Sequence, residues 1–308
     1  MKVLLTGAGG QLGQALCKAL PAQIDHEPVE LIPTARLAEP LRGVLALDLA
    51  DAMACREMVR EHRPDWVLNA GAYTAVDRAE EESELAHAVN AKAPEAFASA
   101  LAEVGGRLLQ VSTDFVFSGQ QGVPYKPDQP TAPLGVYGAS KAKGEQLIAS
   151  CLGRASDGPA TILRTSWVYG PVGRNFFLTM LRLHAERASS HEPLRVVADQ
   201  VGCPTSTLGL ASACWAVLKK KTGGVLHWSD AGAASWYDFA VAIGELGVDA
   251  GRLECCAQVE PITTADYSTP AQRPAYSLLD CSDTRKRLGL NAMHWRVALQ
   301  QVMRDAEQ

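Results

Sequence analysis

Residues 1–13 read MKVLLTGAGGQLG, and this stretch decides the fold of the chain. Residues 3–5 form a short apolar run, which is typical of a strand in a buried sheet. Gly7, Gly10 and Gly13 follow with the spacing G-x-x-G-x-x-G, and apolar side chains then recur as on one face of a helix. Such a turn aims backbone N–H groups at one point, and glycines lack the Cβ atoms that would keep a pyrophosphate away. The stretch therefore predicts a dinucleotide-binding unit.

The composition limits the classes of protein to which the chain can belong. With 308 residues, 47% of them apolar, it is long enough for one large α/β domain and a smaller appended one. A net charge of −5 argues against nucleic acid or an anionic membrane as a partner. We find no apolar run long enough to span a bilayer. Because the first predicted strand begins at residue 3, we expect no signal peptide and a cytoplasmic location.

The eight cysteines are scattered through the chain, and the sequence contains no C-x-x-C pair. This scattering predicts neither a disulfide framework nor a zinc site. We therefore expect free, mostly buried thiols in a reducing compartment, and no metal site.

Predicted strands and helices alternate as far as residue 165. Further strands are expected at 29–32, 44–47, 65–69, 108–111 and 161–164, with helices at 52–61, at 77–104 and from 137 onward. This alternation predicts a Rossmann-type, doubly wound parallel sheet in an α/β fold. From residue 166 the elements become intermittent, which favours a smaller C-terminal lobe. We expect a dinucleotide-binding domain over 1–165 and mainly a substrate-binding lobe over 166–308, with the chain crossing back to the first domain.

The residues after the predicted strand 29–32 bear on the choice of cofactor. A carboxylate at this place usually binds the adenosine 2′-hydroxyl and repels a 2′-phosphate. Here the strand runs through Pro33, Thr34 and Ala35 to Arg36, with no acid. We therefore expect NADPH to be accepted, with NADH accepted as well. The alternative is that Arg36 only solvates a loop.

Tyr137 and Lys141 have the spacing Y-x-x-x-K at the start of a predicted helix. They share one helical face, so the ammonium group can lie near the phenol. A cation there favours the phenolate and should lower the phenol pKa from its reference value of about 10. Alone, such a pair is mostly a surface feature. After a glycine turn and the S-T-D strand end at 112–114, it indicates a catalytic pair.

Seven strings spread over nearly the whole chain resemble the extended short-chain dehydrogenase/reductases. They are GAGGQLG (7–13), NAGAYTAVDRAE (69–80), STDFVF (112–117), VYGASKAKGE (136–145), RTSWVYG (164–170), DQVGCPT (199–205) and STPAQRP (268–274). The second and fifth strings are typical of a branch that reduces nucleotide sugars. Epimerases and dehydratases of the wider family rarely carry both.

The resemblance implies hydride transfer from NADPH or NADH to C4 of a 4-keto-6-deoxy nucleotide sugar. Tyr137 would donate the proton, Lys141 would hold the nicotinamide ribose and Thr113 would orient the carbonyl. The residues implied for the cofactor are Gly7, Gly10, Gln11, Leu12 and Gly13 at the pyrophosphate, Asp48 and Leu49 at the adenine, and Gly71, Ala72, Tyr73, Tyr137 and Lys141 elsewhere. Those implied for the substrate are Thr113, Asp114, Trp167 and Arg273. The resemblance also allows a homodimer.

The sequence departs from the family pattern at three places. Phe115 stands where many members have Tyr, which removes one hydroxyl contact. Tyr276 and Leu278 stand where Asn and Arg are common, which weakens the expected contact with a nucleotide diphosphate. An acid that belongs to a magnesium-bridged dimer in some members is missing near Gln14 and Ala15. Magnesium is therefore allowed by the resemblance but not predicted from this sequence.

Several alternatives stay open at this point. Another nucleotide-sugar epimerase or dehydratase would need an acid and a base, and Asp114 could supply one but Phe115 cannot. A non-catalytic regulatory subunit could use the same fold. Trp167 either faces the substrate or packs in the core, and Asn90 either braces the strand ends or is an ordinary polar helix residue.

Overall fold

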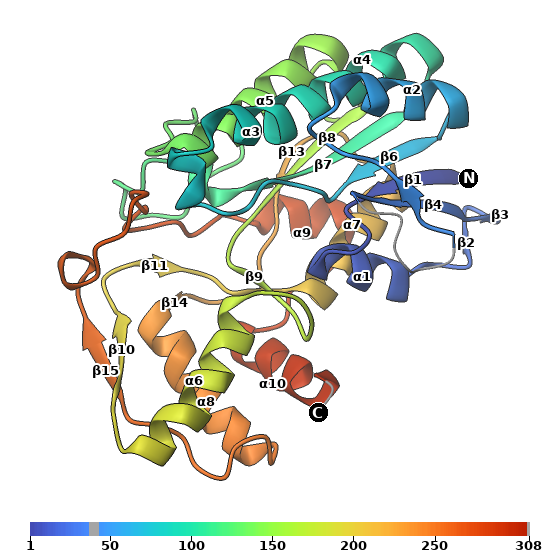
Figure 1. Ribbon diagram of the computed structural model, residues 1–308. Coiled ribbons are helices and arrows are strands. Elements are labelled where there is room, and N and C mark those ends of the chain that lie inside the picture. The colour runs from blue at the N-terminus through green and yellow to red at the C-terminus, as the bar shows by residue number, and fades with distance from the viewer. Residues whose placement is uncertain (37–42, 307–308) are drawn as a thin grey trace.

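The computed structural model describes residues 1–36 and 43–306. A seven-stranded sheet in the order β13-β8-β7-β6-β1-β4-β5 forms its centre, and all neighbouring strands are parallel (Figure 1). The strands are β1 (Lys2–Thr6), β4 (Glu30–Ala35), β5 (Leu45–Ala46), β6 (Trp66–Asn69), β7 (Arg107–Thr113), β8 (Ala160–Thr165) and β13 (Gly224–His227). The predicted doubly wound, Rossmann-type sheet is confirmed.

Helices cover both faces of this sheet. They are α1 (Gln11–Lys18), α2 (Ala52–His62), α4 (Ala93–Val104), α5 (Val136–Leu152) and α7 (Thr207–Lys220). In Figure 1, α2, α4 and α5 lie over one face and α1 and α7 over the other. The central strands β6 and β8 are buried along their whole length. Parallel strands in such sheets have no face in water, and β6 is accordingly apolar up to Asn69. Strand β8 also buries polar side chains, and its Arg164 is paired with Glu145 of α5 at 2.7 Å.

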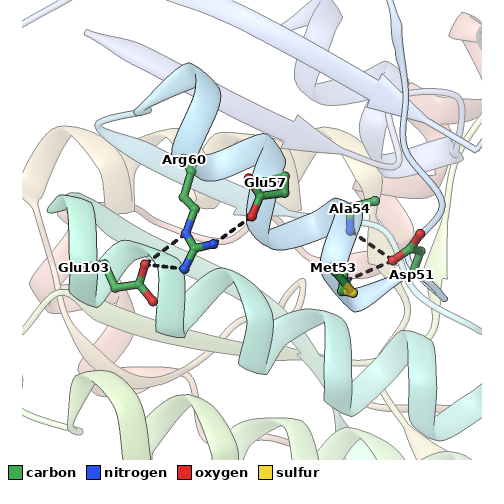
Figure 2. Close-up of polar contacts among 6 residues, drawn as sticks. All are labelled: Asp51, Met53, Ala54, Glu57, Arg60 and Glu103. Atoms are coloured by element: carbon green, nitrogen blue, oxygen red, sulfur yellow. Dashed lines mark hydrogen bonds and ion pairs between the residues drawn. The ribbon is translucent and has the colours of Figure 1, made fainter.

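Helix α2 is fixed at its start and along its length. Asp51 caps the helix by accepting two backbone N–H bonds from its first turn, each 3.0 Å long (Figure 2). Arg60 is paired with Glu57 at 2.7 Å and with Glu103 of α4 at 2.8 Å. These exposed ion pairs orient α2 beside α4 but contribute little free energy, so the buried side chain of Val59 carries more of the packing.

The helix expected over 77–104 is not continuous. It consists of the 3₁₀ turn η1 (Arg78–Glu80), α3 (Ser83–His87), the π-helical turn η2 (Ala88–Lys92) and α4. Pro94 explains part of the break, because it has no N–H to donate to the carbonyl of Asn90. Helix α5 also approaches that carbonyl so closely that a Cβ at Gly144 would collide with it. The prediction of one long helix is therefore wrong, and the break falls beside the helix that carries Tyr137.

The second lobe has an apolar core of its own. Its elements are β9 (Val168–Tyr169), α6 (Phe176–Ser190), β10 (Leu194–Val197), β11 (Val201–Gly202), β12 (Thr205–Ser206), β14 (Ala234–Ser235), α8 (Trp236–Asp249), β15 (Val259–Ile262) and α10 (Trp295–Asp305). Phe177, Phe239 and Leu299 are fully buried where α6, α8 and α10 meet. Strands β10 and β15 pair in parallel at the outer side of these helices (Figure 1).

The chain returns to the first domain after residue 205. Helix α7 packs on α1, where the indole N–H of Trp215 donates to the carbonyl of Leu16 at 3.2 Å. Strand β13 then pairs with β8, and α9 (Ser282–Leu288) packs against α7 and β13. The remaining short elements are β2 (Gln23–Ile24), β3 (Glu27–Pro28) and the turns η3 (Asp114–Val116) and η4 (Thr264–Asp266).

Two further expectations concern the whole chain. Within residues 1–36 and 43–306, no helix combines the length and the apolarity that crossing a bilayer requires. All eight cysteines are free thiols, but only four of them are buried, so the expectation that most are buried is wrong.

Candidate active site

The glycine turn joins β1 to α1 at the carboxyl edge of the sheet. Gly7 has a φ of +67°, and a Cβ there would lie 2.7 Å from the Cα of Gly71. A Cβ at Gly13 would collide with the carbonyl of Gly7, so glycine lets α1 pack against the turn. Gly10, the N-cap of α1, has no side-chain cap. The first N–H groups of α1 therefore point at a place suited to an anion.

Thr113, Tyr137 and Lys141 come together beside this edge. Thr113 is the last residue of β7, and Tyr137 and Lys141 occupy the first two turns of α5. Lys141 is 4% exposed, and its ammonium group donates to the carbonyl of Val111 at 2.7 Å. Tyr137 is half-buried, and the ring of Phe115 meets its ring edge-on at 5.5 Å.

Burial controls the acidity of this pair. Desolvation raises the pKa of Tyr137 to about 12, with the Thr113 hydroxyl opposing the shift and Asp114 adding to it. Desolvation lowers the pKa of Lys141 to about 8, and Glu145 opposes that shift. The expectation that Lys141 lowers the phenol pKa is therefore wrong. Tyr137 is protonated at neutral pH, which is the state that a proton donor needs.

Asp114 is a buried carboxyl group directly after Thr113. Its Oδ1 accepts from the Thr113 hydroxyl at 3.0 Å, whereas its Oδ2 has no partner among the described residues. Burial raises the pKa of Asp114 to about 6. The side chain lines the cavity described below, so its second oxygen remains for a polar ligand.

Asn90 braces the loop that leaves β6. Its amide accepts from the backbone N–H of Tyr73 at 3.0 Å and donates to the Tyr73 carbonyl at 3.0 Å. It also donates to the hydroxyl of Ser140 in α5 at 3.1 Å. Of the two interpretations of Asn90 that the sequence left open, the structure shows the one in which Asn90 braces the strand end. The Tyr73 phenol itself donates to Glu82 at 2.6 Å.

A cavity of about 690 Å³ runs between the glycine turn, α5 and the second lobe. Of the residues expected at the site, it is lined by Gly7, Gly10, Gln11, Leu12, Gly13, Gly71, Ala72, Thr113, Asp114, Tyr137, Lys141, Trp167 and Arg273. These residues come from both lobes and from segments far apart in the sequence. The structure thus brings the glycine turn and the Tyr–Lys pair to one cavity.

Four expected side chains do not line this cavity within the described part of the chain. The phenol of Tyr73 is held by Glu82, as given above. Asp48 is exposed and accepts the N–H of Ala50 at 2.9 Å, while Leu49 packs against Gly71. Arg36 is exposed and follows β4 directly. The expected cofactor contacts of these four side chains stay predictions.

Trp167 extends into the cavity from the exit of β8. It is half-buried, has a φ of +46°, and its ring stacks on Trp236 at 3.6 Å with 8° between the planes. A fully buried core position is thereby excluded for Trp167.

A second cleft, of about 820 Å³, adjoins the first in the C-terminal lobe. Its lining includes two basic residues, Arg187 and Arg195, and the apolar side chains of Phe176 and Val197. Arg273 lines both clefts and makes a bidentate ion pair with Asp77, with distances of 2.8 and 3.0 Å. Basic groups beside an apolar wall suit a ligand that carries both phosphates and a ring.

The residues that line the first cavity without having been predicted as site residues include Arg174, Asn175 and Trp236. Asn175 caps α6 and also donates to the Gln11 side chain at 3.2 Å, which links the second lobe to the glycine turn. An Asn directly before an apolar run predicts the start of a helix. Nothing in the sequence indicates that this cap meets Gln11, because 164 residues separate them.

No cluster of three or more His, Cys, Asp or Glu side chains with metal-binding geometry occurs in residues 1–36 and 43–306. Asp77 and Asp114, the carboxyl groups discussed above, each have a different partner. Asp77 is paired with Arg273, and Asp114 bonds to Thr113.

Comparison with known proteins agrees with this geometry. A dTDP-4-dehydrorhamnose reductase of Aggregatibacter actinomycetemcomitans is 37% identical, covering 99% of each chain. A probable dTDP-4,6-dihydroxy-2-methyloxan-3-one 4-ketoreductase of Streptomyces antibioticus is 39% identical, covering 99% of this chain and 95% of that one. The crystal structure of the Bacillus anthracis dTDP-4-dehydrorhamnose reductase in complex with NADP superimposes with a TM-score of 0.84, 31% identity and 99% coverage of each chain.

The family described as the RmlD substrate binding domain matches residues 1–308, which is the whole chain. The glycine turn, the Tyr–Lys pair and the second lobe all lie within this match. The chain therefore belongs to the RmlD family.

Proposed function

We propose that this protein is an NADPH-dependent reductase that converts dTDP-4-dehydro-L-rhamnose to dTDP-L-rhamnose. The observation that carries the proposal is the convergence of Thr113, Tyr137 and Lys141 with the glycine turn in one cavity. A non-catalytic subunit would have no need for a protonated phenol and a buried ammonium group in one cavity with the glycine turn. The relatives named above as dTDP-4-dehydrorhamnose reductases support the choice of reaction.

The residues present fit a nicotinamide dinucleotide. Gly7 and Gly13 leave room for backbone to approach a pyrophosphate, and the N-terminus of α1 has no side-chain cap. Gln11 and Leu12 continue the same wall of the cavity toward Val168 of the second lobe. When bound, NADPH would supply the hydride.

Three side chains supply the proton, orient the carbonyl and hold the nicotinamide ribose. Tyr137, with its raised pKa, keeps its proton at neutral pH and gives it to the C4 oxygen as negative charge develops there. The Thr113 hydroxyl, which donates to Asp114 at 3.0 Å, would turn to the substrate carbonyl to orient it. Lys141 is held by the Val111 carbonyl and can donate to the nicotinamide ribose. A carboxylic acid of ordinary pKa would be ionised at neutral pH and could not replace the phenol.

The substrate is proposed to lie across the two clefts. The sugar would face Trp167 and Asp114 in the first cleft, and Arg273 would lie near the diphosphate. The nucleotide would extend into the second cleft, where Arg195 supplies further positive charge and Arg187 is paired with Glu192. The Streptomyces antibioticus relative indicates that other 4-keto deoxysugars are reduced within this family.

The test is a turnover assay with two sugars. NADPH consumption should be measured with dTDP-4-dehydro-L-rhamnose generated in situ, and with dTDP-4-dehydro-6-deoxyglucose as the control substrate. We expect rapid turnover with the first sugar, and a loss of about 100-fold or more in Tyr137→Phe with little change in NADPH affinity. No NADPH consumption by the wild type, or near-normal turnover in Tyr137→Phe, would contradict the proposal.

Three coarser features complete the proposal. We place the reaction in the cytoplasm, supported by eight free thiols that need a reducing compartment. We assign cofactor binding mainly to residues 1–165 and substrate binding mainly to 166–308, supported by the linings of the two clefts. A homodimer stays a prediction, to be measured by light scattering.

A further inference from the structure

The two clefts have lining residues in common. Within the described chain, Trp236 and Arg273 are the residues that line both the 690 Å³ cavity and the 820 Å³ cleft. A ligand that occupies both clefts would lie beside both of these residues. Arg273 is fixed on its side by the bidentate ion pair with Asp77. The other shared residue is Trp236, to which neither the motifs nor the family resemblance assigns a function.

Trp236 supports a strained neighbour. Trp167 has a φ of +46°, in the left-handed region that residues with a large side chain rarely adopt. Such a conformation persists only where the surroundings enforce it. The Trp236 ring covers one face of the Trp167 ring at 3.6 Å, nearly parallel. One edge of the Trp167 ring is confined by Gly202, where a Cβ would lie 2.6 Å from the ring.

Both contacts come from one small antiparallel strand pair. Strand β11 carries Gly202, and β14 ends at Ser235, directly before Trp236. The pair aligns Gly202 with Ala234, so the edge contact and the face contact are set by the same backbone register. Ser235 also caps α8 through a reciprocal capping box with Asp238. Trp236 therefore has a fixed backbone at the start of a capped helix.

We propose that Trp236 is a positioning residue of the reductase. It holds Trp167 in the left-handed conformation against the sugar, from the wall that the two clefts share. A flat apolar ring on this wall excludes water from the face of a deoxysugar while leaving Arg273 for the charged diphosphate. This inference rests on the proposed function, because it concerns how that substrate is held.

The experiment compares Trp236→Ala and Trp236→Phe with the wild type. In Trp236→Ala, we expect KM for dTDP-4-dehydro-L-rhamnose to rise about threefold to tenfold, the range expected for loss of one aromatic stack. Trp236→Phe should be intermediate, since a smaller ring keeps part of the stack. The NADPH Kd should stay within about twofold, because the Trp236 ring stacks on Trp167, which is assigned to the substrate and not to the cofactor. The matched control is Trp295→Phe, a buried tryptophan of the same lobe that lines neither cleft.

A double-mutant cycle with Trp167→Ala separates positioning from mere packing. If Trp236 acts through Trp167, the double variant should lose about as much kcat/KM as Trp167→Ala alone. Circular dichroism provides a signature of the pair, since either single variant should abolish the exciton couplet of two stacked indoles. Additive losses, or a lowered Tm with unchanged KM, would overturn the role of Trp236. An active wild type with unaffected variants would reject this inference alone, whereas an inactive wild type would reject the proposed function and this inference with it.

Discussion

Tyr137 and Lys141 show how burial sets the chemistry of single side chains. The phenol has a pKa raised to about 12, so it stays protonated throughout the neutral range. The ammonium group has a pKa lowered to about 8, so it loses its proton far more readily than an exposed lysine. In the proposed reaction the group that limits activity at high pH is therefore Lys141.

This difference predicts the pH dependence of catalysis. As pH rises through about 8, Lys141 loses the charge that would hold the nicotinamide ribose, so kcat/KM should fall. Lys141→Arg, which stays charged, should shift this fall in kcat/KM to higher pH. Stability should change in the opposite direction. Between about 8 and 10.5 the unfolded chain binds more protons than the folded one, so the free energy of unfolding contributed by Lys141 rises with pH. A flat kcat/KM up to pH about 9 would contradict the assignment.

Ala35 tests the place of the adenosine ribose. It is the last residue of β4, and the backbone of Thr34 beside it accepts the N–H of Ala8 in the glycine turn at 2.9 Å. Ala35→Asp should repel a 2′-phosphate and raise KM for NADPH about tenfold or more, with little effect on NADH. Ala35→Asn is the neutral control of the same shape. Equal effects on both cofactors would show that this strand end does not contact the ribose phosphate.

At the scale of elements, the contact between α5 and the π-helical turn η2 should be sensitive. A Cβ at Gly144 would meet the Asn90 carbonyl, so Gly144→Ala should push α5 away from η2. We expect a loss of about 1–3 kcal/mol in stability and a lower kcat, because α5 carries Tyr137 and Lys141. Thermal unfolding and turnover measure the two effects. Gly122→Ala, where a Cβ would meet nothing within 4 Å, is the control; equal behaviour of both variants would refute the argument.

The elements differ in how well the sequence predicts them. The glycine turn and the alternation up to residue 165 follow from local periodicity, so the sheet could be predicted. The break at Pro94 was missed because the apolar pattern continues across it, and a π-helical turn has no local pattern of its own. Spacing places Tyr137 and Lys141 on one face. It shows neither the desolvation of Tyr137, which raises the phenol pKa, nor that the Lys141 ammonium bonds to Val111.

At the scale of the whole molecule, the Asp77–Arg273 ion pair ties the two halves of the chain together. Both side chains are partly exposed, at 40% and 24%, so the pair contributes about 1 kcal/mol or less to stability. Asp77→Asn should leave Tm nearly unchanged. It should raise KM for the nucleotide sugar several-fold, because Arg273 would lose its fixed position between the clefts. Arg60→Gln, which breaks an exposed pair far from the clefts, is the control. A lowered Tm with unchanged KM would contradict this account of Arg273.

Site residues could be predicted only where they belong to one of the seven sequences that resemble the dehydrogenase/reductase family. Trp236 and Arg174 lie outside those sequences, and only the tertiary fold brings them to the cavity. Trp167 belongs to the sequence RTSWVYG, but sequence alone does not decide between contact with the substrate and packing in the core. Its half-buried stack on Trp236, seen only in the fold, decides it. Cavities between lobes are set by contacts between distant segments, which periodicity and spacing do not encode.

The central claim is that Tyr137 and its neighbours direct a hydride to C4 of the sugar. The most direct measurement uses NADPH deuterated at C4 of the nicotinamide, with dTDP-4-dehydro-L-rhamnose as substrate and the product analysed by mass spectrometry and NMR. We predict dTDP-L-rhamnose that carries deuterium at C4 of the sugar, and almost none from Tyr137→Phe in the same time. Unlabelled product, label at another carbon, or equal labelling by Tyr137→Phe would contradict the account.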